Sequence, residues 1–105
     1  MNENRIMIVD DEVDILNLLE KALNIEGYYN ITKVDNGLDA VSICKQIQPD
    51  VIILDIVLPG IDGYEVCKRI RQFSHCSCEQ YKLNEKKRKL CVVLFHTYRI
   101  KNILE

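Results

Sequence analysis

Four carboxylates occur at two places where an apolar run ends, and they are the residues of this chain that could do chemistry together. Asp10, Asp11 and Glu12 directly follow the apolar run at residues 6–9, and Asp55 closes the run "VIILD". Like charges held close together resist ionisation unless a cation lies among them. Hard divalent cations such as Mg²⁺ prefer oxygen ligands and keep some waters for a phosphate partner. The pattern therefore indicates an acidic metal site in which one carboxylate could also be a nucleophile.

These acids can meet only if the segments that carry them are neighbouring strands of one sheet. Apolar runs predict strands, and apolar residues at a helical period predict helices. The expected strands are residues 5–9, 29–34 and 50–55, and the expected helices are residues 11–27, 38–48 and 64–73. This β-α-β-α-β-α order predicts an α/β fold with a parallel sheet and helices on both faces. Because sites in such sheets lie at the carboxyl ends of the strands, Asp11 and Asp55 are expected at one edge.

Simpler roles for the same residues stay open from the sequence. Asp10 or Asp11 could cap the helix that follows, and Asp55 could be a turn residue at a strand end. In the loop "IVLPGIDG" at residues 56–63, Asp62 is better explained as a turn or cap residue than as a metal ligand. The metal-site interpretation is favoured because both acidic groups end apolar strands at a separation that two helices and one strand would fill.

The tail of the chain has a different pattern from residues 1–73. Within residues 74–105, the segment "CEQYKLNEKKRK" at 78–89 is polar and basic, and a solvated helix explains it better than a docking site. "LCVVLF" at 90–95 predicts one buried strand, and residues 98–105 predict a short helix. The chain thus divides into a β-α-β-α-β-α segment and a divergent tail.

Composition limits the classes of function. The 105 residues are 48% hydrophobic and 29% charged, which fits one globular domain. A formal net charge of −2 does not favour general nucleic-acid binding, and no apolar run approaches the ~20 residues of a membrane span. No signal peptide is visible, so a cytoplasmic location is expected. The five cysteines are an odd number without a zinc-binding spacing, so free thiols are expected.

Two motifs and their spacing resemble the receiver domain of two-component response regulators. The motifs are "VDDE" at residues 9–12 and "ILDIVLPGIDG" at residues 53–63, and the resemblance covers residues 5–73. It implies a flavodoxin-like sheet and a role in phosphorelay signal transduction, as a phosphoprotein and not as an enzyme that turns over a substrate. A sensor histidine kinase would be the phosphoryl donor, and a second receiver is a candidate dimer partner.

The resemblance also assigns roles to individual residues. It implies that Asp55 is the phosphoacceptor, and that Asp11 binds Mg²⁺ directly while Asp10 binds it through water. The full set of implied Mg²⁺ ligands is Asp10, Asp11, Asp55 and the backbone carbonyl of Val57. The residues that match the family's D-x-x-x-P-x-x-D-G loop, and would shape it, are Pro59, Asp62 and Gly63.

The resemblance breaks in the tail. In the family, strand four ends in Ser or Thr and strand five ends in Lys followed by Pro, but residues 82–85 read "KLNE" and the chain has no Lys-Pro pair. If residues 90–95 are a displaced fourth strand, Thr97 would lie at its end, and Lys101 is the candidate lysine, although it is close to Thr97. A shift of reading frame near residues 75–78 is the alternative. Either way, the fold is expected to be incomplete at its C-terminal end and the switch impaired.

Two other classes of function stay open. The chain could be a non-phosphorylated interaction domain derived from a receiver, or an acid-nucleophile phosphatase of the haloacid-dehalogenase type. That phosphatase family requires Asp-x-Asp at the end of its first strand, and "VDDEVD" at residues 9–14 does not place its aspartates in this way. The leading interpretation is a receiver module that contacts neither nucleic acid nor a membrane directly.

Overall fold

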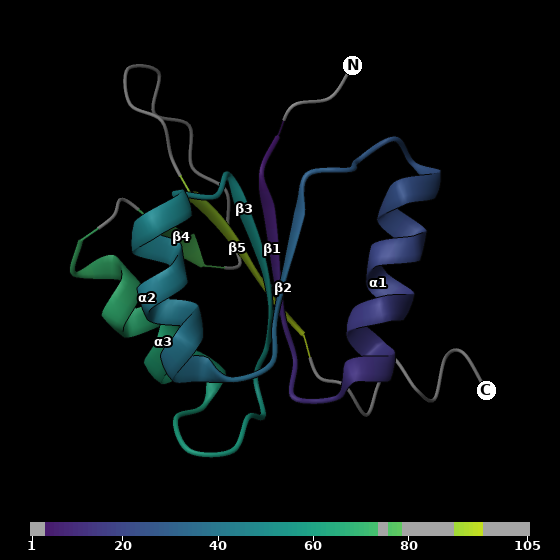
Figure 1. Cartoon of the computed structure of the whole chain (residues 1–105). Coiled ribbons are helices and arrows are strands. Elements are labelled where there is room, and N and C mark those ends of the chain that lie inside the picture. Colours follow the sequence, from purple (N-terminus) through teal and green to yellow (C-terminus); the bar gives the residue numbers. More distant parts are fainter. Residues whose placement is uncertain (1–3, 74–75, 79–89, 96–105) are drawn as a thin grey trace.

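The computed structural model describes residues 4–73, 76–78 and 90–95, which form five strands and three helices (Figure 1). The strands are β1 (Ile6–Val9), β2 (Ile31–Val34), β3 (Val51–Asp55), β4 (Cys76–Cys78) and β5 (Leu90–Phe95). The helices are α1 (Val13–Ile25), α2 (Gly37–Ile47) and α3 (Gly63–Arg71). In these ranges, no helix has both the length and the apolar character needed to cross a membrane.

All five strands belong to one parallel sheet with the order β2-β1-β3-β5-β4. β1 pairs with β2 on one side and with β3 on the other, so that Val9 is in register with both Val34 and Leu54. On the far side of β3, β5 places Phe95 in register with Asp55. A flavodoxin-like sheet has the order 2-1-3-4-5. This sheet therefore has the flavodoxin-like arrangement around β1 and β3, with its last two strands exchanged.

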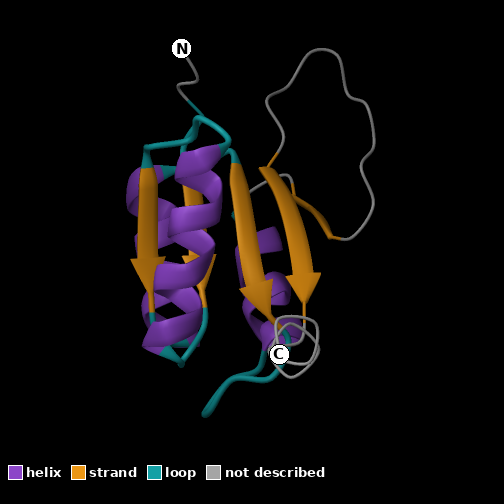
Figure 2. Cartoon of the chain, turned by 90° about the vertical axis from the view of Figure 1, so that its right-hand side faces the viewer, coloured by secondary structure: helices purple, strands orange, loops and turns teal. Residues whose placement is uncertain are grey.

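The direction of each crossover explains which face a helix covers. The chain moves from β1 outward to β2 through α1, and then back across β1 to β3 through α2. Right-handed crossovers that run in opposite directions place their helices on opposite faces of the sheet. Accordingly, α1 lies on one face, whereas α2 and α3 lie on the other (Figure 1). On the α1 face, the described helix covers β1 and β2 (Figure 2). Val93 of β5 is 45% exposed.

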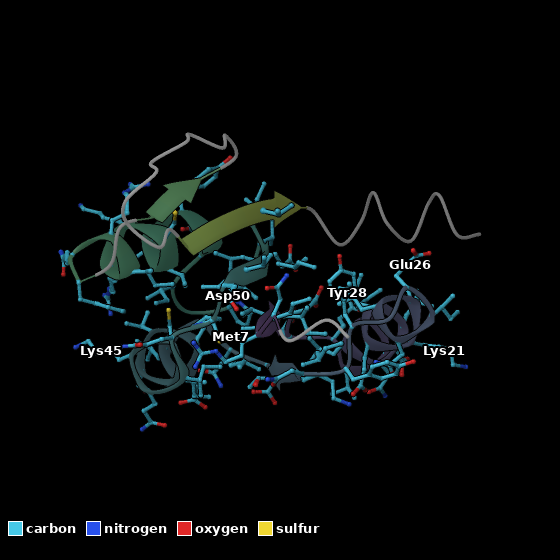
Figure 3. The ribbon with its side chains drawn as sticks, turned by 90° about the horizontal axis from the view of Figure 1, so that it is seen from above. Met7, Lys21, Glu26, Tyr28, Lys45 and Asp50 are labelled. Atoms are coloured by element: carbon cyan, nitrogen blue, oxygen red, sulfur yellow. The ribbon has the colours of Figure 1, made fainter. Side chains whose placement is uncertain are left out.

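Two apolar cores follow from the alternation of side chains along the strands. Met7 and Val9 point toward α2 and α3 and belong to the larger core, while Ile6 and Ile8 face α1 and belong to the smaller one. Seen from above, Met7 lies between the two helical layers, and Lys45 lies at the outer side of α2 (Figure 3). β1 is buried along its whole length, which fixes the strand that carries the first two aspartates.

Local sequence signals set the starts of two helices. The side chain of Asn36 accepts a hydrogen bond from the Asp39 N–H at 2.8 Å and caps α2. Asp62 accepts one from the Glu65 N–H at 2.9 Å and caps α3. α1 starts differently, because its N-cap residue Glu12 makes no side-chain cap.

The order of elements expected through residue 73 is confirmed, as is the strand at 90–95. Every expected element through residue 73 differs from the observed one by one or two residues at an end, and the two-residue differences are at the starts of α1 and β2 and the ends of α1 and α3. The three-residue strand β4 was not expected, and it lies beside β5 at the edge of the sheet. The basic helix within 78–89 and the helix at 98–105 fall mainly or wholly outside the described residues.

The cysteines only partly follow the expectation of free thiols. Cys44, a buried residue of α2, forms no disulfide bond, as expected. Cys67 of α3 is disulfide-bonded, so the expectation is wrong at this position. An odd number of cysteines gives no information about which thiols a fold brings together, and for this reason the pairing could not be predicted.

Candidate functional site

Asp10 and Asp11 follow β1 directly and have opposite environments. Asp10 is fully buried, at 0% exposure, and its Oδ1 accepts a hydrogen bond from the Glu12 N–H at 2.8 Å. The Asp10 N–H donates to the Val34 carbonyl at 3.1 Å, so the pairing of β1 with β2 continues through this residue. Asp11 is exposed. The pair therefore provides one carboxylate held inside the fold and one at the surface, where an ion can enter.

Asp55 is the last residue of β3, the strand next to β1. Its side chain is 1% exposed, and its Oδ1 accepts a hydrogen bond from the Val57 N–H at 3.1 Å. This contact holds the carboxylate against the start of the following loop. A carboxylate with so little access to water is costly unless it is hydrogen-bonded and near a cation.

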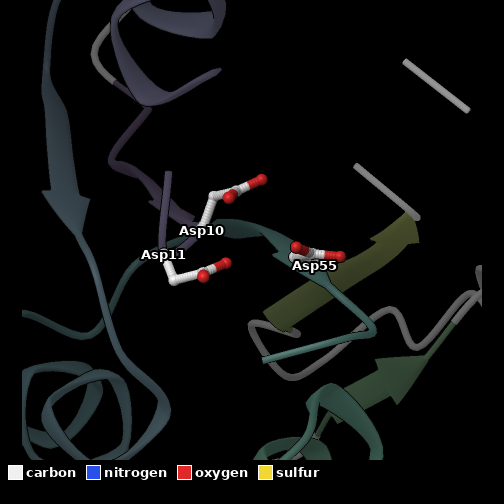
Figure 4. Close-up of side chains that lie close together, drawn as sticks. All are labelled: Asp10, Asp11 and Asp55. Carbon is white, nitrogen blue, oxygen red and sulfur yellow. The ribbon is translucent and has the colours of Figure 1, made fainter. Parts of the chain in front are cut away.

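The three aspartates meet at the carboxyl edge of the sheet (Figure 4). One carboxylate oxygen from each of Asp10, Asp11 and Asp55 lies within 4.8 Å of the others. Opposite ligands of an octahedral Mg²⁺ ion are about 4.2 Å apart, since each Mg–O bond is about 2.1 Å long. The oxygens are thus spaced for a shared ion after a small inward movement, or with a water replacing one of them. An all-oxygen donor set fits Mg²⁺ and does not fit a soft metal.

The loop after β3 is held tightly at its two ends. The Gly63 N–H donates to the Ile56 carbonyl at 2.8 Å, which closes the loop over residues 57–62. A Cβ atom at Gly63 would lie 2.5 Å from the Asp55 carbonyl oxygen and 2.8 Å from the Ile56 Cα atom. Gly63 is therefore required because the start of α3 packs directly on the backbone of Asp55. Inside the loop, Leu58 is buried in the larger core and anchors it.

The other predicted residues of this loop have different environments, and a role in shaping the loop stays a prediction for Pro59. Asp62 caps α3, as expected, and Pro59 is exposed on the loop. Gly60 has a φ of +83°, a conformation that favours glycine. Val57 donates its N–H to Asp55, while the role of its carbonyl as a metal ligand stays a prediction.

One residue near the site was missed from the sequence. Gly37 is the first residue of α2, and a Cβ atom there would lie 2.7 Å from Ile61 Cγ1 and 2.9 Å from Val66 Cγ2. From the sequence, the "DNG" stretch at residues 35–37 predicts only a turn. The signal available in the sequence was a glycine directly after a capping Asn, at the first position of a helix. No turn conformation requires glycine there, so close packing against another segment is the remaining reason for it.

The two switch candidates, Thr97 and Lys101, lie outside the described residues. The structure describes the strand that precedes them, β5. β5, which is the segment considered as a displaced fourth strand, lies next to β3, and its last residue, Phe95, is in register with Asp55. Residues 90–95 contain no hydroxyl side chain.

Asp11→Asn is expected to raise the thermal stability of the metal-free protein and to weaken its binding of Mg²⁺ by about tenfold or more. The substitution removes one of three neighbouring like charges, so the metal-free protein becomes more stable. It also removes an anionic ligand, so Mg²⁺ binds more weakly. Melting curves with and without Mg²⁺ measure both effects. Asp14→Asn, an exposed change in the first turn of α1, is the matched control. It should leave Mg²⁺ binding unchanged and should slightly lower the melting temperature, because it removes a charge that is favourable at a helix N-terminus. A lower melting temperature of metal-free Asp11→Asn would contradict the shared-ion site.

Comparisons with known proteins agree with this geometry. The model of the response regulator receiver domain family matches residues 6–80. A relative named "Probable transcriptional regulator ycf27" from Guillardia theta is 44% identical over 72 residues, which are 69% of this chain and 28% of the relative. Its namesake from Porphyridium aerugineum is 40% identical over 74 residues, which are 70% of this chain and 30% of the relative. The chain therefore spans less than a third of the length of these curated relatives.

Solved structures give the same result for the fold. The response regulator TrrA from Thermotoga maritima, solved in complex with Mg²⁺ and BeF, is 31% identical with a TM-score of 0.65, covering 96% of each chain. The N-terminal domain of a response regulator receiver protein from Methanoculleus marisnigri is 18% identical with a TM-score of 0.64, covering 98% of this chain and 93% of that one, and supports the fold alone. The family model matches most of the described residues, and the three expected aspartates lie together at one edge of the sheet. The chain therefore belongs to the response regulator receiver domain family of two-component systems.

Proposed function

We propose that this chain accepts a phosphoryl group on Asp55 from a sensor histidine kinase, in a reaction that requires Mg²⁺. The observation that carries the proposal is the approach of Asp10, Asp11 and Asp55 to within 4.8 Å of one another from two neighbouring strands. Receiver domains as a family are signalling domains that such kinases phosphorylate, and all the residues used here lie within 1–73. The net charge of −2 gives no support for direct binding of nucleic acid by this chain.

In the proposed reaction, an Asp55 carboxylate oxygen attacks the phosphorus of a phosphohistidine in line with the leaving imidazole. The new bond is P–O, the bond that breaks is P–N, and its electron pair stays on the imidazole nitrogen. Asp55 is oriented by the Val57 N–H, and burial excludes competing water from the carboxylate. Bound Mg²⁺, with Asp11 as a direct ligand, Asp10 through water and the Val57 carbonyl, would neutralise the charge on the phosphoryl oxygens.

The proposal includes an impaired switch. In the family, a hydroxyl at the end of the strand next to the acceptor contacts the phosphoryl group. Here the register partner of Asp55 is Phe95, and β5 carries no hydroxyl along residues 90–95. Thr97 is the nearest candidate in sequence, with Lys101 as the candidate lysine. We therefore expect phosphorylation without the full conformational response, since added charge acts only through an element that can respond to it.

Intact-mass measurement after incubation with a small phosphoramidate donor and Mg²⁺ tests the proposal. We expect an adduct of about 80 Da, one phosphoryl group, that decays on standing because acyl phosphates hydrolyse. The absence of an adduct at saturating donor would contradict the proposal and favour a non-phosphorylated interaction domain. Continuous release of phosphate over many turnovers, without an accumulated adduct, would favour a phosphatase instead.

A further inference from the structure

Gly37 is the first residue of α2, a helix that carries none of the three aspartates, yet it sits against the loop that follows Asp55. It is buried at the start of α2, and a Cβ atom there would come within 2.7 Å of Ile61 Cγ1 and 3.0 Å of the Ile61 carbonyl oxygen. Real Cβ atoms essentially never come closer than 3.0 Å to another heavy atom. The backbone of α2 and the loop are therefore in contact at a point that has no room for a methyl group.

Ile61 transmits this contact toward the acceptor. The next residue, Asp62, caps α3 through the Glu65 N–H, and Gly63 packs on the carbonyl of Asp55 with room for no Cβ atom. Two close glycine contacts therefore connect α2 to the acceptor: Gly37 of α2 packs on Ile61, and Gly63 at the start of α3 packs on Asp55. Packed interiors transmit such displacements instead of absorbing them.

From this series of contacts we infer that Gly37 is a positioning residue for the phosphorylation site. This inference rests on the proposed function. In it, the first turn of α2 sets the position of the loop after β3, and Val57 of that loop orients Asp55. The Val57 N–H donates to Asp55 at 3.1 Å, so displacement of the loop alters the acceptor and the neighbouring carbonyl together. The start of α2 is fixed locally, because the Asn36 side chain accepts a hydrogen bond from the Asp39 N–H.

The test compares Gly37→Ala with Gly27→Ala. Gly27 lies in the turn after α1, at the opposite edge of the sheet, with a φ of +97° and open space around its Cβ position. Alanine at Gly27 strains the backbone and lowers stability without touching the loop. We expect Gly37→Ala to slow adduct formation by about 10- to 100-fold per folded molecule and to weaken Mg²⁺ binding, since small misplacements of reacting groups have effects of this size. Gly27→Ala should leave both unchanged.

A rescue variant separates positioning from general damage to the fold. Ile61→Ala removes the nearest of the three atoms that the new methyl would meet, while Val66 Cγ2 at 2.9 Å and the Ile61 carbonyl oxygen at 3.0 Å remain. Gly37→Ala/Ile61→Ala should therefore react faster than Gly37→Ala without reaching the wild-type rate. Ile61→Ala alone loosens the contact and should weaken Mg²⁺ binding, which keeps the test available if Gly37→Ala does not fold. Wild-type adduct rates and Mg²⁺ affinity in Gly37→Ala, or in Ile61→Ala if only that variant folds, would overturn the inference. A wild-type chain that forms no adduct would instead refute the proposed function, and the inference with it.

Discussion

Asp55→Asn is expected to abolish the phosphoryl adduct completely. The asparagine has nearly the same volume and keeps an oxygen that can accept the Val57 N–H, so the fold should persist. Its amide, however, has no anionic oxygen to attack phosphorus. Removal of a buried charge from a cluster of three aspartates should also leave the metal-free protein at least as stable as the wild type. Intact-mass spectra with the phosphoramidate donor and Mg²⁺ measure the adduct, and thermal melts measure stability.

Asp14→Asn is the matched control for this substitution. It makes the same chemical change at an exposed position in the first turn of α1, outside the acidic cluster. We expect its adduct to form at the wild-type rate. A persistent adduct of about 80 Da on folded Asp55→Asn would show that another side chain is the acceptor.

Gly63→Ala is expected to have the largest effect on stability, a loss of about 3 kcal/mol in the free energy of unfolding, at the upper end of overpacking. The new Cβ atom would meet the Asp55 carbonyl oxygen at 2.5 Å and the Ile56 Cα atom at 2.8 Å. Both are backbone atoms of the β3 end, so relief requires β3 and α3 to move apart. Urea denaturation followed by circular dichroism measures the loss.

Gly60→Ala provides a control in the same loop. Gly60 has a φ of +83° and open space around its Cβ position, so alanine adds backbone strain of about 1–2 kcal/mol without a collision. If Gly63→Ala costs no more than Gly60→Ala, the close packing of α3 on the acceptor is not a constraint on this fold.

The grouping of Asp10, Asp11 and Asp55 at one edge of the sheet could be predicted from the sequence, because local signals and the rules of parallel sheets are sufficient for it. The apolar runs before Asp10 and at β3 identify two buried strands, and the carboxyl ends of neighbouring parallel strands share an edge. The "IDG" at the end of the loop correctly indicates a capping Asp62 followed by a glycine that the fold requires.

Other features depend on contacts between distant segments. β5 lies between β3 and β4 in the sheet. This position depends on pairing with distant strands, and no feature within "LCVVLF" indicates it. β4 has only three residues, which is too short for a hydrophobic period to identify a strand. Gly37 is required by side chains of Ile61 and Val66, which lie more than twenty positions away in sequence.

The most direct test of the central claim is the dependence of phosphorylation on Mg²⁺ concentration. The rate of adduct formation, with the modified residue located by peptide mass spectrometry, should rise to saturation with the same half-point as Mg²⁺ binding measured by calorimetry. The modified peptide should contain Asp55, and no adduct should form in the presence of a chelator. An adduct that forms equally fast without divalent metal, or that maps to a residue outside the cluster of Asp10, Asp11 and Asp55, would contradict the account.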